Sequence, residues 1–144
     1  MNKQEKLDNL YMDIAERVAQ MSYGRRLKVG SVLTKETNII SYGWNGTPSG
    51  TDNNCEIEHS DGSLSTKPDV LHAEANSIMK LVSSDGAISS KDSILYTTHS
   101  PCYECAKLIK QAGIARVVFR HQYRLPEGIN LLRRLGVQVE QLKD

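Results

Sequence analysis

The chain has few aromatic residues and no long apolar run. Its 144 residues include one Trp and one Phe, aromatic residues make up 6% of the total, and the formal net charge is +1. Proteins that bind nucleic-acid strands need basic surface with stacking aromatics, so this composition favours a small-molecule substrate and no nucleic-acid partner. No segment approaches the roughly 18 apolar residues of a membrane span, and residues 1–21 lack the apolar centre of a signal peptide. We therefore expect a cytoplasmic protein that does not bind membranes.

Cysteine is also scarce, with three residues in the chain. An odd number of cysteines without a secretory signal argues against a disulfide framework and favours metal binding or catalysis. The length suits one domain, residues 1–144, whose core needs no covalent crosslinks.

Hydrophobic periodicity in the first half predicts a helix followed by a hairpin. Residues 4–22 have apolar residues at spacings of three and four and are predicted to form an amphipathic helix that Gly24 ends. Its apolar stripe would be Leu7, Leu10, Tyr11, Ile14, Val18 and Met21. The β-branched stretches 27–36 and 38–46 indicate a β-hairpin. Residues 45–68, rich in Gly, Ser, Thr, Asp and Asn, are predicted to form a long loop, a candidate binding segment.

In the second half, helical and strand patterns alternate. Residues 71–82, 101–112 and 128–135 have helical patterns, the second of them closed by Gly113, and residues 93–98, 115–120 and 137–142 have strand patterns. Single helices between strands imply parallel neighbours, so we predict a three-layer α/β sandwich.

Three residues form a candidate catalytic zinc site: His72, Cys102 and Cys105. Catalytic zinc takes three protein ligands and keeps a fourth position for water, whereas a structural site takes four. Two cysteines three residues apart at the start of a helix can share one metal ion. Ser100 and Pro101 fit the N-cap and N1 positions of that helix, whose dipole would favour the thiolates.

Glu74 follows His72 by two residues and is the candidate general acid and base. The pattern H-x-E followed by P-C-x-x-C is the signature of zinc nucleobase deaminases, in which the glutamate moves protons between water and the base. A non-catalytic zinc module with Cys55 or His99 as fourth ligand remains an alternative, but it leaves Glu74 unexplained.

Nearly the whole chain resembles the deoxycytidylate (dCMP) deaminases of the cytidine deaminase fold. The resemblance rests on VGSVLTKETNIISYGWNGTPSG, HAEANSIM and LYTTHSPCYECAKLIKQAGIARVVF. It implies a three-layer α/β/α sandwich with a mixed five-stranded sheet. It also implies zinc-dependent hydrolysis of dCMP to dUMP and ammonia, which supplies dTMP synthesis. A base deaminase that acts on tRNA or single-stranded DNA remains an alternative, although such an enzyme needs more basic and aromatic surface.

The resemblance also suggests which residues bind the substrate. Asn45 would lie near the sugar hydroxyl, although its residue type equally suits a turn before Gly46. Arg26 is a candidate for the 5′-phosphate, and Tyr123 for the base or phosphate. The remaining candidates for substrate binding are Ala73 and Ser100.

Many members of this family are hexamers that dCTP activates and dTTP inhibits at the N-G-x-P-x-G loop. We expect a homo-oligomer with such regulation, and the triphosphate would bring Mg²⁺. The candidate residues for the allosteric nucleotide are Arg25, Lys28, Gly46, Thr47, Gly50 and Asp52. Some relatives carry a second zinc in the following segment. The donors here are Cys55, Glu56, Glu58 and His59, and a loop without a matching partner ligand favours no second metal.

Overall fold

A mixed five-stranded sheet forms the centre of the molecule. The structure is a computed structural model that describes residues 1–123 and 125–143. The strand order is β2-β1-β5-β6-β7, with β1 antiparallel to both β2 and β5, while β5, β6 and β7 run parallel. The mixed sheet confirms the predicted fold. The elements are α1 (Lys3–Ala19), β1 (Gly30–Lys35), β2 (Asn38–Trp44), β3 (Glu56–Glu58), β4 (Leu64–Thr66), α2 (Ala73–Val82), β5 (Ile94–His99), α3 (Tyr103–Gln111), β6 (Arg116–His121), α4 (Glu127–Arg134) and β7 (Gln138–Gln141).

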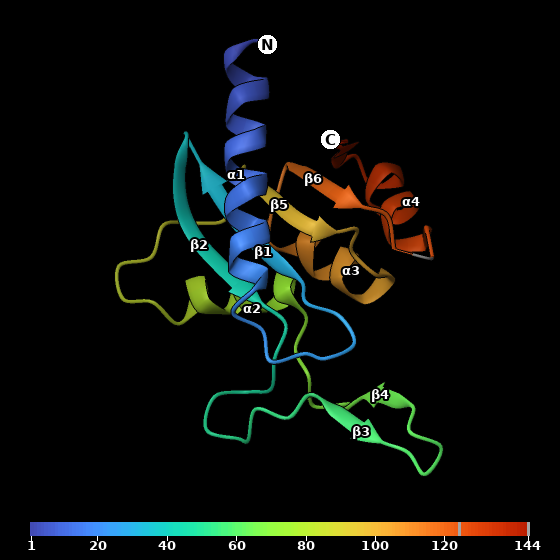
Figure 1. Ribbon diagram of the computed structural model, residues 1–144. Coiled ribbons are helices and arrows are strands. Elements are labelled where there is room, and N and C mark those ends of the chain that lie inside the picture. Colours follow the sequence, from blue (N-terminus) through green and yellow to red (C-terminus); the bar gives the residue numbers. More distant parts are fainter. Residues whose placement is uncertain (124, 144) are drawn as a thin grey trace.

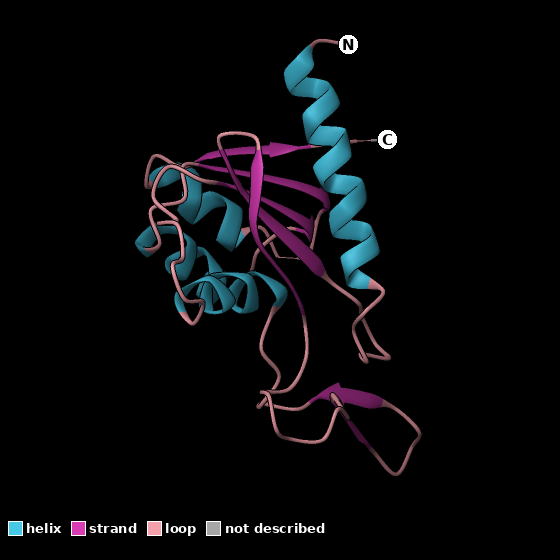
Figure 2. Ribbon diagram, turned by 90° about the vertical axis from the view of Figure 1, so that its left-hand side faces the viewer, coloured by secondary structure: helices cyan, strands magenta, loops and turns pink. Residues whose placement is uncertain are grey.

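Helices cover both faces of this sheet, which confirms the three-layer prediction. α1 lies on one face, and α2, α3 and α4 lie on the other (Figures 1 and 2). The core is divided accordingly. A larger apolar cluster, including Leu33, Ile109 and Leu132, fills the side of the three helices, and a smaller one, including Met12 and Tyr96, lies under α1. Among the described residues, no helix is both long and apolar enough to cross a membrane.

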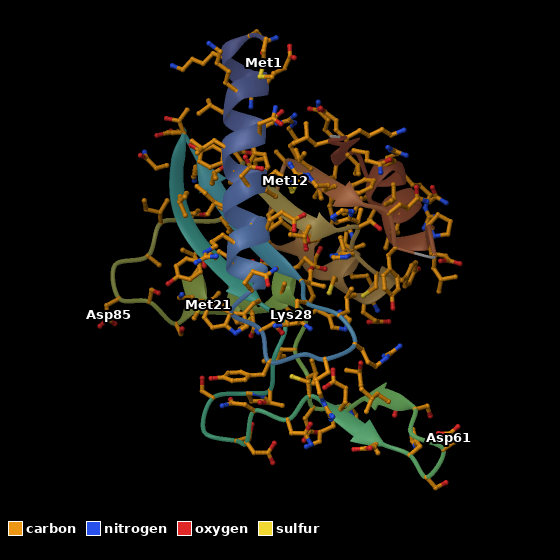
Figure 3. The ribbon with its side chains drawn as sticks, in the orientation of Figure 1. Met1, Met12, Met21, Lys28, Asp61 and Asp85 are labelled. Atoms are coloured by element: carbon orange, nitrogen blue, oxygen red, sulfur yellow. The ribbon has the colours of Figure 1, made fainter. Side chains whose placement is uncertain are left out.

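The helix α1 is shorter than predicted but packs most of the predicted stripe on the sheet, since Tyr11 belongs to the core cluster and Leu7, Ile14 and Val18 pack against it. It ends at Ala19 with Gln20 as C-cap, well before Gly24. Leu10 is 51% exposed and Met21, just past the helix end, is 59% exposed, so both predicted stripe positions were wrong (Figure 3). The buried face consists of Asp8, Tyr11, Met12, Ala15 and Ala19.

Close packing explains why small residues face the sheet under α1. A Cβ atom at Gly30, the first residue of β1, would lie 2.1 Å from the carbonyl oxygen of Ala15 and 2.5 Å from the nitrogen of Ala19. The backbones of β1 and α1 approach so closely that larger side chains are directed elsewhere.

The predicted hairpin of β1 and β2 is confirmed, with Glu36 and Thr37 in its turn. Both residues have positive φ angles, 51° and 65°, which suit a tight two-residue connection between twisted strands. The other helices and strands of the second half also form where the patterns place them, within a few residues.

Residues 45–68 are not the unstructured loop that their composition suggests. They contain the short antiparallel strands β3 and β4, which extend away from the body of the molecule (Figures 1 and 2). The turn between them is closed by polar groups, because the Asp61 carboxylate accepts hydrogen bonds from the nitrogen and hydroxyl of Ser63. Within the described part of the chain, β3 and β4 contact each other and no other helix or strand.

A buried polar network ties α1 to the other side of the fold. Arg116 of β6 donates two hydrogen bonds to the Asp8 carboxylate, at 2.9 and 2.8 Å, and two to Glu140 of β7, at 3.0 and 2.9 Å. The Tyr96 hydroxyl donates to the same Asp8 carboxylate at 2.7 Å. These charges are paired on every side, as buried charges must be.

Candidate active site

Two helix N-termini bring three metal-binding side chains together. His72 is the N-cap residue of α2, and Cys102 is the N-cap residue of α3, with Cys105 in the first turn. The imidazole of His72 makes no capping hydrogen bond. Its Nδ1 atom instead lies 3.3 Å from the sulfur of Cys105 and 3.5 Å from that of Cys102. The three donor atoms lie within 4.8 Å of one another.

This donor set fits a tetrahedral zinc ion. Zinc–sulfur bonds of about 2.3 Å and zinc–nitrogen bonds of about 2.0 Å, at a tetrahedral angle, place nitrogen and sulfur about 3.5 Å apart. The two nitrogen–sulfur distances of 3.3 and 3.5 Å are close to that value. Three ligands leave one tetrahedral position unfilled by protein, which is the pattern of a catalytic zinc site.

The start of α3 differs from the prediction. Cys102, not Ser100, is the N-cap residue, and Pro101 lies before the helix. The backbone of Cys102 is extended, with φ −73° and ψ 172°, and its sulfur accepts a hydrogen bond from the Cys105 nitrogen at 3.5 Å. Ser100 instead links the end of β5, which it follows, to the end of β6 and the residues just after it. Its nitrogen donates to the His121 carbonyl, and its hydroxyl accepts from the Tyr123 nitrogen at 2.6 Å.

The two cysteines differ in acidity. Hydrogen bonds from the Cys105 thiol and the His72 imidazole lower the pKa of Cys102. The neighbouring Cys102 sulfur and burial raise the pKa of Cys105. Cys102 is therefore the more acidic of the two thiols, and the thiolate is the form that binds zinc.

Glu74, in the first turn of α2, is a buried carboxyl group beside the metal ligands. It is 4% exposed, and burial raises its pKa above the ordinary value of 4.5. A raised pKa brings a carboxyl group nearer to the pH at which it can both accept and return a proton. Its position and acidity suit the predicted role in proton transfer.

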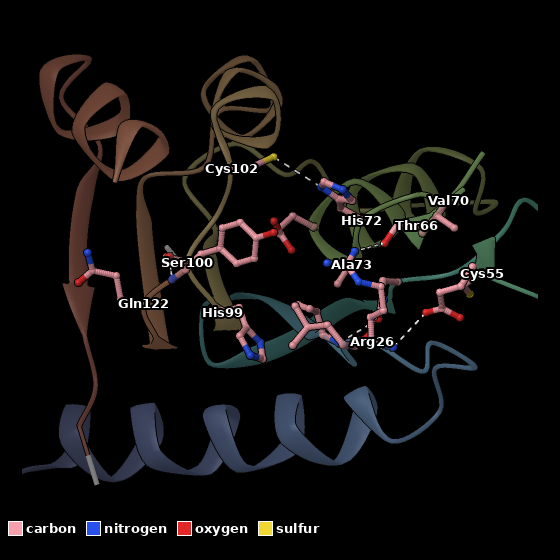
Figure 4. A pocket seen from close by; sticks show the side chains of 16 residues that line it. Arg26, Cys55, Thr66, Val70, His72, Ala73, His99, Ser100, Cys102 and Gln122 are labelled. Atoms are coloured by element: carbon pink, nitrogen blue, oxygen red, sulfur yellow. Dashed lines mark hydrogen bonds between the residues drawn. The ribbon is translucent and has the colours of Figure 1, made fainter. Parts of the chain in front are cut away.

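A cavity of about 400 Å³ connects this centre with the surface. His72, Glu74 and Cys102 line it beside the predicted metal site, and Arg26 and Thr66, two exposed residues that also line it, form what we call the rim. Figure 4 shows the hydrogen bond between Cys102 and His72 and the one from Arg26 to Thr66, which measure 3.5 and 2.9 Å.

The structure places all five predicted substrate-binding residues around this cavity. These are Arg26, Asn45, Ala73, Ser100 and Tyr123. His99, named above as a possible fourth zinc ligand, also lines it, and burial lowers the pKa of its imidazole. Tyr103 is 47% exposed and is not among the residues that line this cavity.

Asn45 uses both ends of its side chain to hold the loop that precedes β1. Its Oδ1 accepts a hydrogen bond from the Val29 nitrogen, and its Nδ2 donates to the Leu27 carbonyl, both at 2.9 Å. The residue thus shapes the cavity wall through the backbone as well as lining it.

The residues predicted for an allosteric nucleotide lie outside the cavity. Arg25 forms an ion pair with Glu56, and Asp52 forms one with Lys67. The Thr47 hydroxyl donates to the Asp52 carbonyl at 2.6 Å, and Gly50 has a φ of 89°. Lys28 and Gly46 belong to the two segments that Asn45 joins.

The candidate second zinc ligands do not converge. Cys55 is buried, Glu56 binds Arg25, and the His59 ring contacts the Ser65 hydroxyl at 2.7 Å. Among residues 1–123 and 125–143, His72, Cys102 and Cys105 are the one group of three or more side chains that could hold a metal ion.

Sequence reasoning missed the place of several residues in the cavity wall, among them the polar residues Glu56, Thr66 and Gln122. Thr66 belongs to a strand that was not predicted, and Gln122 follows β6 with no motif around it. Glu56 was noticed only as a metal donor. Its neighbours in space, Arg25 and Arg26, are about 30 residues away in the sequence, so no local spacing could show the contact.

Comparisons with known proteins agree with this geometry. The family described as "Cytidine and deoxycytidylate deaminase zinc-binding region" matches residues 5–121. A deoxycytidylate deaminase of Schizosaccharomyces pombe is 32% identical over 93% of this chain, which spans 43% of that protein's length. The deoxycytidylate deaminase of phage T4 is 30% identical over 89% of this chain and 86% of its own length.

A solved structure is also similar over its full length. The dCMP deaminase of cyanophage S-TIM5, crystallised with dCMP and dUMP, is 45% identical, with a TM-score of 0.87 over 99% of both chains.

Proposed function

The chain belongs to the family of cytidine and deoxycytidylate deaminases, and from this membership we propose that it hydrolyses dCMP to dUMP and ammonia. One observation carries the proposal: His72, Cys102 and the buried Glu74 line one cavity together with Arg26, and Cys105 completes the group of three metal-binding side chains. The similar cyanophage enzyme, solved with dCMP and dUMP, supports this substrate. The product dUMP is the precursor that a methylation to dTMP consumes.

The chemistry requires water to be activated and the amino group to leave. His72, Cys102 and Cys105 would hold a zinc ion, which would lower the pKa of a water molecule toward neutral pH. Glu74 would accept a proton from the attacking water and deliver it to N3 of cytosine, and it would then move a proton to the exocyclic nitrogen, which leaves as ammonia. Oxygen replaces nitrogen at C4, so the atoms balance as dCMP plus water to dUMP plus ammonia.

The walls of the cavity orient the nucleotide. Arg26, Asn45, Ala73, Ser100 and Tyr123 line the cavity together with Glu74. We assign the 5′-phosphate to Arg26, which is exposed, and contacts with the rest of the nucleotide to the other four. A guanidinium group suits a phosphate because it offers several N–H donors in one plane.

An absorbance assay of the zinc-loaded protein tests the proposed reaction. We expect dCMP to lose its cytosine absorbance, and CMP and deoxycytidine to react more slowly. No turnover on any of the three nucleotides would overturn the proposal, and a tRNA substrate would then be tested with the same preparation.

We further propose that dCTP with Mg²⁺ activates the enzyme and that dTTP inhibits it, in a homo-oligomer such as a hexamer in the cytoplasm. The glycines of the loop 45–50 and the cation Lys28 support a triphosphate site there, with Thr47, Asp52 and the Arg25–Glu56 ion pair beside it. Isothermal titration of dCTP in Mg²⁺ buffer should show saturable binding. No heat at millimolar dCTP would overturn the regulation, and light scattering would measure the oligomeric state.

A further inference from the structure

One buried carboxylate in the cavity wall has no part in the proposed proton transfers. Glu56, the first residue of β3, is 3% exposed. Its Oε2 accepts hydrogen bonds from the backbone nitrogens of Arg25 and Arg26, at 2.8 and 3.1 Å, and its Oε1 accepts one from Nε of Arg25 at 3.3 Å. A buried carboxylate is stable only when it is paired in this way. Glu56 therefore connects the hairpin of β3 and β4 with the loop at the cavity rim.

This connection matters because the hairpin has few others. In the described chain β3 and β4 contact no other helix or strand. Besides the bonds to Glu56, two side-chain hydrogen bonds join the hairpin and the residue just before it to the loop that contains Arg25 and Arg26. Nη1 of Arg26 donates to the Thr66 hydroxyl at 2.9 Å, and Nη2 of Arg25 donates to the Asn54 side chain at 3.3 Å. The position of Arg26 is thus set from both strands of the hairpin.

The two arginines differ in how their charges are paired. Glu56 forms an ion pair with the guanidinium of Arg25, but it contacts Arg26 only through the backbone. The guanidinium of Arg26 is hydrogen-bonded to a neutral hydroxyl, and among the described residues no carboxylate forms an ion pair with it. The positive charge of Arg26 consequently stays available to an anion at the rim.

We propose that Glu56 is a positioning residue for the 5′-phosphate of the substrate. Glu56 fixes the backbone of Arg25 and Arg26 and forms an ion pair with Arg25. The guanidinium of Arg26 is thereby held at the rim, where it can bind the phosphate. The inference rests on the proposed function and deepens it, because it explains how a nucleoside monophosphate is preferred over a nucleoside.

The variant Glu56→Gln tests this role, with Glu58→Gln as matched control. The amide replaces an acceptor oxygen with an N–H group that faces other donors, so the loop should move. We expect the KM for dCMP, and the dissociation constant of dUMP by isothermal titration, to rise about tenfold. The kcat should change by less than about twofold, and binding of deoxyuridine should stay the same. Glu58 is exposed on the same strand, so Glu58→Gln should match wild type.

A double variant separates positioning from general damage. Arg26→Ala should weaken dUMP binding as Glu56→Gln does, and the two changes together should cost no more than one alone, since they act on one contact. Thr66→Val keeps the shape of the side chain and removes the hydroxyl that holds Arg26. Thr66→Val should also weaken the binding of dUMP but not that of deoxyuridine. It replaces Glu56→Gln as the test if Glu56→Gln does not fold.

Three results would overturn the proposal: normal dUMP binding by Glu56→Gln, equal weakening of dUMP and deoxyuridine, or additive losses in the double variant. The proposed function fails separately, if wild type binds dUMP in a Glu56-dependent manner but turns over no dCMP.

Discussion

At the scale of single residues, the site depends on groups whose surroundings change their ordinary chemistry. Glu74 is an acid that burial makes weaker, and Cys102 is a thiol that its neighbours make stronger. The two changes serve different purposes. The first provides a group that can exchange protons, and the second provides a ligand that is ready for metal.

Glu74→Gln should lower kcat by at least about 100-fold, because an amide cannot move protons. The zinc content should stay at one ion per chain, since Glu74 is not among the three donor residues. Kinetics on dCMP and elemental analysis measure the two quantities. Glu127→Gln is the matched control, an exposed glutamate in the first turn of α4. A near-normal rate in Glu74→Gln would contradict the assigned role.

The sequence was sufficient to predict which residues meet at the centre, but not what each contributes to the local structure. The pairs His72 with Glu74 and Cys102 with Cys105 lie close in the chain, so their spacing alone indicated a site. Asn45 shows the limit. Its bonds to Leu27 and Val29 depend on a loop path that no pattern of residue types predicts.

At the scale of helices and strands, the glycines of the sheet decide how closely the site is held. Gly43 of β2 faces α2. A Cβ atom there would lie 2.6 Å from the Ser77 nitrogen and 2.9 Å from the Ala73 carbonyl oxygen, both backbone atoms that cannot rotate away. The N-terminus of α2, with His72 and Glu74, is thereby placed against the sheet.

Gly43→Ala should therefore push α2 outward. We expect the free energy of unfolding to fall by about 1–3 kcal/mol, and kcat to fall as well, because Glu74 moves with the helix. Denaturant unfolding and dCMP kinetics measure both effects. Ile39→Ala, at a 43% exposed position of the same strand, should leave kcat unchanged. An unaltered kcat in Gly43→Ala would show that α2 can shift without disturbing the site.

The elements with regular periodicity could be predicted, and the β3–β4 hairpin could not. Its strands have three residues each, too few to establish an alternating pattern, and its polar composition is that of a loop. Leu10 and Met21 were wrongly assigned to the buried stripe of α1 for a related reason. Apolar spacing indicates that a helix is amphipathic, but the close approach at Gly30 determines which residues fit beneath it.

At the scale of the whole molecule, the Arg116 network joins the first helix to the last strand. Arg116 and Asp8 are 108 residues apart in the sequence. Burial by itself raises the pKa of Asp8, but hydrogen bonds from Arg116, Tyr96 and Gln4 leave it below the ordinary value of 3.8. The hydrogen bond from Arg116 likewise holds the pKa of Glu140 below 4.5.

These shifts have a definite effect on stability. Because both carboxyl groups bind protons more weakly in the folded state, their contribution is present above pH values near 4 and is lost as the pH falls through the lowered pKa values. Arg116→Met should lower the free energy of unfolding at pH 7 by about 3–5 kcal/mol, because Asp8 is left buried without its partner.

The difference between wild type and Arg116→Met should shrink at pH 3, where Asp8 of the variant is protonated. Urea unfolding at both pH values measures it, and Arg17→Met, on the exposed side of α1, should show little effect at either pH. An equal difference at pH 7 and pH 3 would mean that the network does not act through charge.

The hairpin of β3 and β4 gives the molecule two parts that can change independently. The metal ligands and Glu74 lie on helices that share the main core, so alterations there cost stability. The hairpin supplies no residue to either core cluster, and its ties to the body are polar. Residues 57–65, none of which is among the residues that line the cavity, can accordingly change in sequence or length while the metal ligands and Glu74 stay where they are.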